Sequence, residues 1–468
     1  MAVTETEADY LVVGAGAMGM AFADTILSET SATVVIVDKN DKPGGHWNYA
    51  YPFVRLHQPS AYYGVNSRAL GSDHIDQSGL NKGMRELASV SEILAYFDRV
   101  MRNDFLESGR VAYFPQSEFL GDGRIRSIAS GRITQVNARK TVDTTYMNVK
   151  VPQTDPPKFP IDEGVRCVAP NALAALPETP DRFVVIGGGK TGIDSCLYLL
   201  DLGVDPERID WIVPRDSWLL DRANVQPAGT NGVSVLQSIL MQISAISEST
   251  SVDDMFTRVS ACGGLLRLSD DVTPSMYRCA TVSRAELEEL RRIPNVIRKG
   301  RVQRLEAGRA VLDQGILETP ENTVFVNCTS DGLEKRPPRP VFDGDLITIQ
   351  AVRPCQQLFS AALIAHVEAT YENDAQKNAI CEPTPHPDSD MDYLQSIGAT
   401  LGAQMKWAAD PELLSWLVDA RLDGITTPDF AAMMHAAAQP GGDALLQPAM
   451  IAMGKISQYL TQKQEVPA

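Results

Sequence analysis

Short apolar runs, each followed by glycines and then by a stretch with helical periodicity, stand at two places in the chain. The first run covers residues 10–13, and the second covers residues 182–186. Runs of this length are typical of buried parallel strands, and apolar positions three or four residues apart are typical of a helix that packs on one face. The pattern predicts two strand–turn–helix units about one domain apart.

The first unit has the glycine spacing of a dinucleotide-binding turn. Its glycines allow a tight turn, let a phosphate approach the backbone and let the helix pack close to the strand; they are Gly14, Gly16 and Gly19. A second strand, over residues 33–37, ends at Asp38. That residue follows the turn at close to the separation of roughly 20 residues at which an acid binds a ribose hydroxyl. Because Asp38 would repel a 2′-phosphate, we expect FAD or NAD here rather than NADP.

The second unit carries a similar turn with a different charge after its second strand. The residues of this turn that we expect to bind a dinucleotide are Gly187, Gly189, Thr191 and Gly192. Val184 stands where a triphosphate-binding P-loop needs a glycine, which excludes that motif. Arg215 follows the strand at residues 209–213, and a guanidinium there can pair with a 2′-phosphate. This half-site is expected to bind NADPH; NADH stays an alternative because Asp216 is adjacent.

Composition and charge narrow the class of protein. The 468 residues are 44% hydrophobic and carry a net charge of −17, which argues against nucleic acid or an anionic membrane as partner. The acidic start lacks the features of a signal peptide, and no apolar run reaches the length of a membrane span, so we expect a cytoplasmic protein.

The seven cysteines are scattered, with no Cys-x-x-Cys, and a disulfide framework is not expected. A redox-active dithiol would need cysteines that are distant in sequence. No metal site is expected, because the histidines form no ligand spacing with the cysteines.

Two segments after Asp38 carry a resemblance to a known family. Residues 44–47 read Gly-Gly-His-Trp, and residues 51–59 read Tyr-Pro-Phe-Val-Arg-Leu-His-Gln-Pro. They resemble the Gly-Gly-x-Trp and Tyr-Pro-x-Leu-Arg-x-Asn-x-Pro segments of flavin-containing and Baeyer–Villiger monooxygenases. The family's Phe-x-Gly-x-x-x-His fingerprint is absent, since residues 167–173 read Cys-Val-Ala-Pro-Asn-Ala-Leu.

The resemblance implies FAD at the first turn and NADPH at the second. It places Gly45 and Trp47 beside the FAD, and it implies that the turn from Gln350 to Gln357 lines the flavin. His57 replaces an asparagine that the family carries near the reactive edge of the flavin. His57 and Arg55 are therefore the candidate catalytic residues, and a histidine there would titrate near neutral pH.

The expected fold is α/β, with two Rossmann-like dinucleotide-binding domains and a helical C-terminal region. Residues 1–175 form the first part of the FAD domain, and residues 176–335 form the NAD(P) domain with an insertion at about 222–290. Residues 336–390 return to the FAD domain, and residues 391–468 form the helical region, which covers a pocket or forms a dimer face if it is not ordinary core.

The function implied is an FAD-dependent, NADPH-consuming monooxygenase that inserts one oxygen atom from O2 into a small organic substrate through a flavin hydroperoxide. One alternative is an oxidase, dehydrogenase or reductase on the same scaffold. Another is a non-catalytic dinucleotide sensor. The expected partners are the substrate and O2, with a homodimer as an open possibility.

Overall fold

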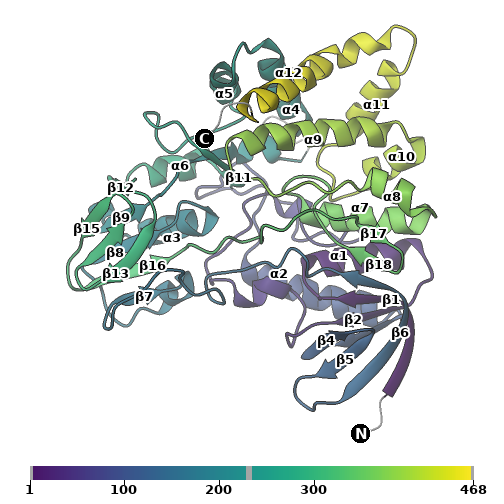
Figure 1. The fold of residues 1–468 in the computed structure, drawn as a ribbon, viewed down its shortest axis with the longest axis horizontal. Helices are drawn as coiled ribbons and strands as arrows, with labels where there is room; N and C mark the ends of the chain where they lie inside the picture. Colours follow the sequence, from purple (N-terminus) through teal and green to yellow (C-terminus); the bar gives the residue numbers. More distant parts are fainter. Residues whose placement is uncertain (1–3, 228–234, 465–468) are drawn as a thin grey trace.

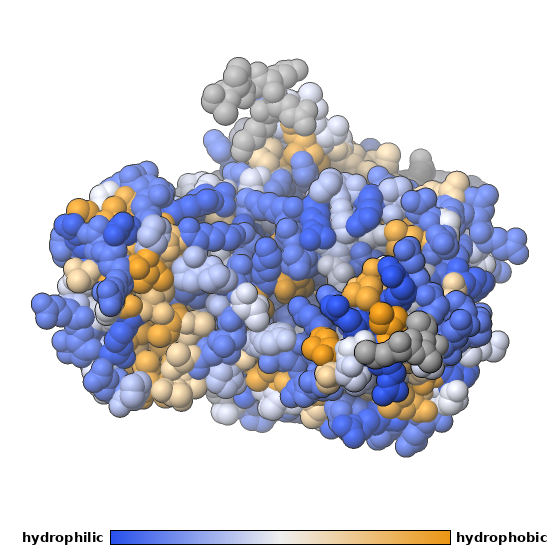
Figure 2. All heavy atoms as spheres, turned by 60° about the horizontal axis from the view of Figure 1, so that its bottom comes forward, coloured by the Kyte–Doolittle hydropathy of each residue, from blue (hydrophilic) through white to orange (hydrophobic). Residues whose placement is uncertain are grey.

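Two α/β units and a helical layer make up the chain in a computed structural model, which describes residues 4–227 and 235–464 (Figure 1). The unit that holds the N-terminus and the unit that holds the second glycine turn lie side by side, and the C-terminal helices lie across one side of both. Within the described ranges, no helix combines the length and the apolar character needed to cross a bilayer. Hydrophilic residues predominate on the face shown in Figure 2, with hydrophobic residues in small groups.

The first unit is built on an eight-stranded sheet with a parallel core. Its main path runs β17-β18-β6-β1-β2-β3, and β4 and β5 form a hairpin that joins β6. The strands are β1 (Thr4–Val13), β2 (Val34–Val37), β3 (Val111–Phe114), β4 (Ser117–Gly121), β5 (Arg124–Ser127), β6 (Ile133–Asp143), β17 (Phe342–Asp343) and β18 (Leu346–Thr348). Every residue of β2 is buried, as expected for a central parallel strand.

Helices from the two ends of the chain pack together against this sheet. α1 (Ala17–Glu29) follows the first glycine turn, and α7 (Gln357–Thr370) packs against it although more than 300 residues separate them. α2 (Val90–Arg99) begins at a capping box, in which Ser89 and Glu92 satisfy each other's backbone N–H groups. α8 (Asp374–Ile380) follows α7. The segment from β17 to α8 therefore belongs to the first unit.

The second unit is a five-stranded parallel sheet in the order β12-β9-β8-β16-β7. Its strands are β7 (Arg166–Val168), β8 (Arg182–Ile186), β9 (Ile209–Ile212), β12 (Asn295–Ile297) and β16 (Thr323–Asn327), and α3 (Lys190–Asp201) follows β8. A three-stranded antiparallel sheet adjoins it, made of β13 (Val302–Glu306), β14 (Arg309–Leu312) and β15 (Gly315–Glu318). β7 was expected in the first domain, but its three residues pair with β16, so this unit begins about ten residues earlier.

The insertion and the C-terminal region form one helical layer instead of two separate parts. Side chains from both share a hydrophobic cluster that includes Ile246, Phe256, Leu394 and Ile456. Its helices are α4 (Val235–Glu248), α5 (Val252–Ala261), α9 (Met391–Ala408) and α12 (Gln447–Gln464). The insertion also supplies β10 (Ser217–Asp221), β11 (Met276–Val282) and α6 (Arg284–Leu290), and the C-terminal region supplies α10 (Pro411–Asp419) and α11 (Pro428–Ala437).

A buried ion pair ties the segment after α10 to the turn before α7. Both Nη atoms of Arg353 bond to the carboxylate of Asp423, at 2.7 and 3.1 Å, and both side chains are almost fully buried. The guanidinium also lies 3.8 Å from the centre of the Phe359 ring. Breaking such a pair from one side leaves a buried charge without its partner, which costs far more than losing a surface pair.

Asp423→Ala should lower the free energy of unfolding by about 3–5 kcal/mol, measured by urea denaturation, because Arg353 keeps its charge in a dry environment. Glu382→Ala, which removes an exposed partner of Lys406, is the matched control and should change it by less than about 0.5 kcal/mol. The double variant Arg353→Met/Asp423→Leu should recover most of the loss. Equal effects of the two single variants would contradict this account.

Candidate dinucleotide sites and the cavity between them

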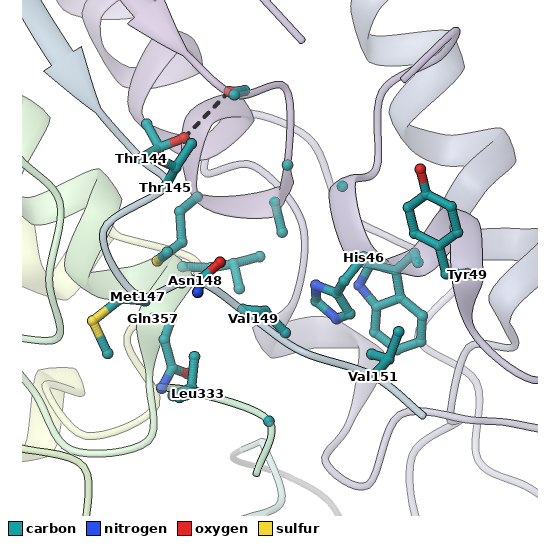
Figure 3. Close-up of a pocket in the computed structure, with 18 of the residues that line it drawn as sticks. His46, Tyr49, Thr144, Thr145, Met147, Asn148, Val149, Val151, Leu333 and Gln357 are labelled. Atoms are coloured by element: carbon teal, nitrogen blue, oxygen red, sulfur yellow. Dashed lines mark hydrogen bonds between the residues drawn. The ribbon is translucent and has the colours of Figure 1, made fainter. Parts of the chain in front are cut away.

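A cavity of about 790 Å³ opens at the carboxyl ends of β1 and β2. This is within the usual size range for cofactor sites. Residues from widely separated segments line it. Figure 3 shows His46 and Tyr49 on one side and Thr144, Met147 and Asn148 on the other. We call it the central cavity; the lining residues used below are Gly14, Gly16, Asp38, Gly45, His46, Trp47, Arg55, His57, Tyr62, Tyr63, Lys190, Cys355, Gln356 and Gln357.

The first glycine turn has the backbone geometry that a phosphate needs. Gly14 has φ +106°, and a Cβ there would lie 2.6 Å from the Thr144 hydroxyl oxygen. A Cβ on Gly19 would lie 2.0 Å from the Gly14 carbonyl oxygen, so the helix can approach the strand only with glycine there. Gly16 is the N-cap of α1 and has no side chain to cap the helix. The first N–H groups of α1 are therefore available for an anion.

Gly44 and Gly45 bring a second stretch of backbone onto this turn. The Gly44 N–H donates to the Ala15 carbonyl at 2.9 Å. Gly45 has φ +57°, and a Cβ there would lie only 2.9 Å from the Cα of Gly16. Contact with the phosphate turn therefore requires glycine at residue 45, whereas Gly44 is required by its φ of +119° and by the Leu94 side chain, 2.7 Å from the position of an added Cβ.

Asp38 lies at the end of β2 with its carboxylate in the central cavity. Its oxygens accept N–H groups of Ala15 at 2.6 Å and Asn40 at 2.7 Å. Burial raises the pKa of the carboxyl above its ordinary value, against the lowering effect of these bonds. Each carboxylate oxygen has a further lone pair, so Asp38 can still accept ribose hydroxyls.

His46 and Trp47 follow the glycine pair and face the same cavity. The indole Nε1–H of Trp47 donates to the Tyr63 hydroxyl at 2.6 Å, which fixes the ring at the cavity wall. Burial lowers the pKa of His46 to about 4, so its imidazole is neutral at physiological pH. His46, Trp47 and Tyr63 thus form an aromatic, uncharged wall of the cavity.

The two candidate catalytic residues both line the cavity. Arg55 donates from Nη1 to the Leu87 carbonyl at 3.0 Å. His57 accepts the Thr281 N–H at Nδ1 at 3.3 Å, so its proton lies on Nε2. Burial, with the nearby charges of Lys190 and Arg222, lowers the pKa of His57 to about 3. The expectation that His57 titrates near neutral pH is therefore wrong: it is a neutral hydrogen-bond donor.

Lys190 belongs to the second glycine turn and yet lines the central cavity. Its ammonium pairs with Asp194, and it donates to the Arg55 carbonyl at 3.3 Å. Asp194 also accepts the Tyr51 hydroxyl at 2.7 Å. Sequence reasoning missed this residue as part of the site; its position between Gly189 and Thr191 was the available signal.

The second glycine turn repeats the first geometry. Gly187 has φ +124°, and a Cβ there would lie 2.6 Å from the Cys328 carbonyl oxygen. A Cβ on Gly192 would lie 1.9 Å from the Gly187 carbonyl oxygen. Gly189 caps α3 without a side chain, and nothing lies within 4 Å of the position its Cβ would take. Thr191 is in the first turn of α3, so the open space at Gly189 faces free N–H groups.

Arg215 lies beside this turn, because its carbonyl oxygen is 3.7 Å from the position of a Cβ on Gly188. Its guanidinium is about one-third exposed and lies 3.5 Å from the Asp388 carboxylate. Asp216 points elsewhere, into a two-point pair with Arg298 at 2.8 and 2.9 Å. Arg298 therefore neutralises the charge of Asp216, which was the reason for keeping NADH as an alternative. Arg215 is available to a phosphate.

Gln350 is placed away from the central cavity. Its side-chain amide is buried and makes two bonds to the backbone of Arg339, at 2.9 and 3.2 Å. Of the expected turn over residues 350–357, it is the last part, Cys355, Gln356 and Gln357, that lines the cavity. A bend between β18 and α7 moves the wall along the chain.

A disulfide joins Cys355 to Cys279, although no disulfide framework was expected from the scattered cysteines. The other five cysteines are free thiols. Across the described parts of the chain, no three His, Cys, Asp or Glu residues come together in a way that could hold a metal ion.

Comparison with known proteins places the chain in a family. Residues 12–65, which contain the first glycine turn and Asp38, match the NAD(P)-binding Rossmann-like domain. The chain is 53% identical over 417 residues to uncharacterized proteins of Mycobacterium bovis and Mycobacterium tuberculosis, over 89% of this chain and 78% of each relative. It belongs to the family of these mycobacterial proteins.

A similarity to one solved structure supports the fold. A steroid monooxygenase bound to NADP superposes with a TM-score of 0.51 over 96% of this chain and 98% of its own, at 16% identity. A closed structure of cyclohexanone monooxygenase gives 0.49 over 93% and 98%, at 15% identity. The expected fold, with two Rossmann-like domains, is confirmed.

The sequence predicts FAD at the first glycine turn, and Gly45→Ala should abolish its binding there, because the added Cβ would press on the backbone of the phosphate turn. The flavin content of the purified protein, from its visible and ultraviolet absorbance, measures this. Gly79→Ala is the matched control: Gly79 has φ +72°, and nothing lies within 4 Å of its added Cβ. A flavin content in Gly45→Ala equal to that of Gly79→Ala would contradict the assignment.

The low pKa of His57 predicts a pH dependence of stability. In the unfolded chain its pKa is about 6.5, and in the folded chain about 3. Between these values the unfolded state binds a proton that the folded state does not, so stability is lost as pH falls below 6.5. His57→Gln should lose less over this window, by up to about 1.4 kcal/mol per pH unit, in urea denaturation at several pH values. Parallel profiles would contradict the buried, neutral state.

Proposed function

We propose that this protein is an FAD-dependent, NADPH-consuming monooxygenase acting on a small organic substrate. The observation that carries the proposal is the pair of glycine cradles, joined by a cavity that residues of both turns line. The fold shared with a steroid monooxygenase bound to NADP supports it. When bound, FAD supplies hydride uptake from NADPH and, once reduced, the activation of O2.

The chain's own residues would hold FAD by both of its halves. The N-terminus of α1, opened by Gly14 and Gly16, binds the pyrophosphate, and Asp38 accepts hydroxyls of the adenosine ribose. His57 and Gln357, which line the same cavity, would hold the isoalloxazine.

NADPH would bind at the second turn. The N–H groups at the start of α3 bind its pyrophosphate, and Arg215 pairs with its 2′-phosphate. Lys190 lies where the second turn meets the central cavity, so its charge faces both sites. Lys190 and Arg55, which both line the cavity, would hold the nicotinamide end of NADPH beside the flavin.

The residues around the reacting end shape its environment. His57 offers a fixed Nε2–H, because Thr281 occupies Nδ1 and the low pKa keeps the ring neutral. Trp47, Tyr62 and Tyr63 give the cavity an aromatic wall, in which the Tyr63 hydroxyl accepts the Trp47 indole N–H, and such a wall limits water. We assign to His57 and Arg55 the role of orienting the isoalloxazine ring of the flavin.

The visible spectrum of the purified protein, without oxygen and before and after NADPH, tests the proposal. Flavin bands that bleach on addition of NADPH would support both half-sites and the hydride step. Admission of oxygen with candidate amines, sulfides and ketones then distinguishes product from peroxide. Flavin that stays oxidised, or peroxide without product from every substrate, would move the function to an oxidase, dehydrogenase or reductase.

Arg215→Ala should raise the Kd for NADP+ by about 10–100-fold, because a charge-assisted contact of about 1.5–3 kcal/mol is lost. The Kd for NAD+ should stay within about threefold, since NAD+ has no 2′-phosphate. Calorimetric titration of the protein measures both. Arg304→Ala, which removes an arginine paired with Asp162 beside the second sheet, is the control. An equal loss for both nucleotides would contradict the role of Arg215.

A further inference from the structure

The Cys279–Cys355 disulfide joins two parts of the molecule at the wall of the central cavity. Cys355 lines the cavity together with Gln356 and Gln357, directly before α7. Cys279 comes from β11 in the insertion, and 76 residues separate the two. Their Cα atoms are 6.3 Å apart, within the range for a disulfide. The fold therefore brings together two cysteines that are far apart in the sequence, where no Cys-x-x-Cys motif supplies such a pair.

The backbone at both cysteines is arranged for this position. Cys279 has φ +56° and Cys355 has φ +62°, a conformation that few residues other than glycine adopt. Cys279 lies at a bulge, because three residues of β11 between Tyr277 and Thr281 face a single residue of β10. Bulges of this kind redirect a side chain and are frequent beside active sites. Left-handed residues held by the surrounding fold are also frequent at such sites.

The surroundings of the pair suit thiol chemistry. Cys355 directly precedes α7, whose N-cap residue Gln356 makes no side-chain cap to the first N–H groups of the helix. A helix N-terminus stabilises a thiolate. On the other strand, Thr281 donates its N–H to His57 and its hydroxyl to the Cys279 carbonyl at 3.3 Å. His57 and the disulfide therefore belong to one wall of the cavity.

We propose that Cys279 and Cys355 form a redox-active disulfide that accepts two electrons from the flavin in the central cavity. The proposal rests on the proposed function, because NADPH supplies those electrons. In the net step NADPH, one proton and the disulfide give NADP+ and two thiols: the S–S bond breaks and two S–H groups form. The pair is thus an internal two-electron store beside the flavin.

The expected cellular setting agrees with this role. Disulfides in reducing compartments are mostly transient, catalytic or redox-sensing. The other free cysteines include Cys196, Cys328 and Cys381, which are buried in different parts of the chain. Cys262 packs on the same hydrophobic cluster as Cys279 and Cys355, so the Cys262→Ser variant below also tests exchange with a third thiol.

The test counts thiols in the holoenzyme under anaerobic conditions. Protein purified in air is mixed with NADPH, denatured, alkylated with N-ethylmaleimide and analysed by peptide mass spectrometry. We expect five alkylated cysteines before NADPH and seven after it, with Cys279 and Cys355 as the two that change. The flavin absorbance is followed in the same samples.

Variants and a flavin-free protein serve as controls. Cys279→Ser should show six thiols both before and after NADPH, and its flavin should still bleach. Cys262→Ser, which removes a half-buried free thiol, should rise from four to six. Gly45→Ala, without bound flavin, should stay at five.

The outcomes separate this proposal from the proposed function. Flavin that bleaches while the count stays at five overturns the redox-active disulfide and leaves the monooxygenase proposal standing. Seven thiols in the protein purified in air also overturn it. Where NADPH fails to bleach the flavin, photoreduction with deazaflavin and EDTA reduces it directly: two new thiols, absent from Gly45→Ala, support the disulfide, and five overturn it.

Discussion

Direct contact between two stretches of backbone, at Gly16 and Gly45, sets the position of everything else around the first dinucleotide site. Gly45 cannot carry a side chain there, since it has φ +57° and an added Cβ would lie 2.9 Å from the Cα of Gly16. The contact holds the segment with His46 and Trp47 over the phosphate turn. The segment that follows contacts α3: the Tyr51 hydroxyl donates to Asp194, and the Arg55 carbonyl accepts the Lys190 ammonium. These two bonds hold the second turn beside the same cavity.

The C-terminal helices stabilise this arrangement from outside. Arg421 donates to backbone carbonyls of residues 61–65, including Tyr63 at 2.9 Å, and only a guanidinium has enough donors in the right fork for such a set. Arg353 and Asp423 join the same region to the turn before α7. The helical layer thus acts on the cavity through the backbone that carries its lining residues, without supplying most of those residues itself.

Local patterns were sufficient for the parts of the fold that local chemistry determines. The glycine turns, the strands before them and Asp38 could be predicted because strand length, φ > 0 and helix periodicity are written in neighbouring residues. The three-residue strand β7 could not, since an edge strand that short has no periodicity to recognise. Its place depends on pairing with β16, more than 150 residues later.

Site properties that depend on distant segments were also out of reach. The pKa of His57 is set by burial and by Lys190 and Arg222, which no spacing near residue 57 reveals. Gln350 follows a strand as expected, yet the bend after it gives the cavity wall to residues 355–357. The pairing of Cys279 with Cys355 is decided by a bulge in β11, which the sequence alone does not indicate.

One aromatic contact gives the two nucleotide sites a shared mechanical element. Phe53, from the segment that lines the first site, stacks on Tyr198 of α3 with ring centres 3.9 Å apart and planes within 5°. Four residues earlier on the same helix face, Asp194 accepts the Tyr51 hydroxyl. α3, whose N-terminus faces the second dinucleotide site, is therefore held in contact with residues 51–53, which lie beside the first site. A displacement of α3 by a ligand at one site therefore moves residues at the other site. If binding of one dinucleotide changes the affinity for the second, binding of the second changes the affinity for the first by the same factor.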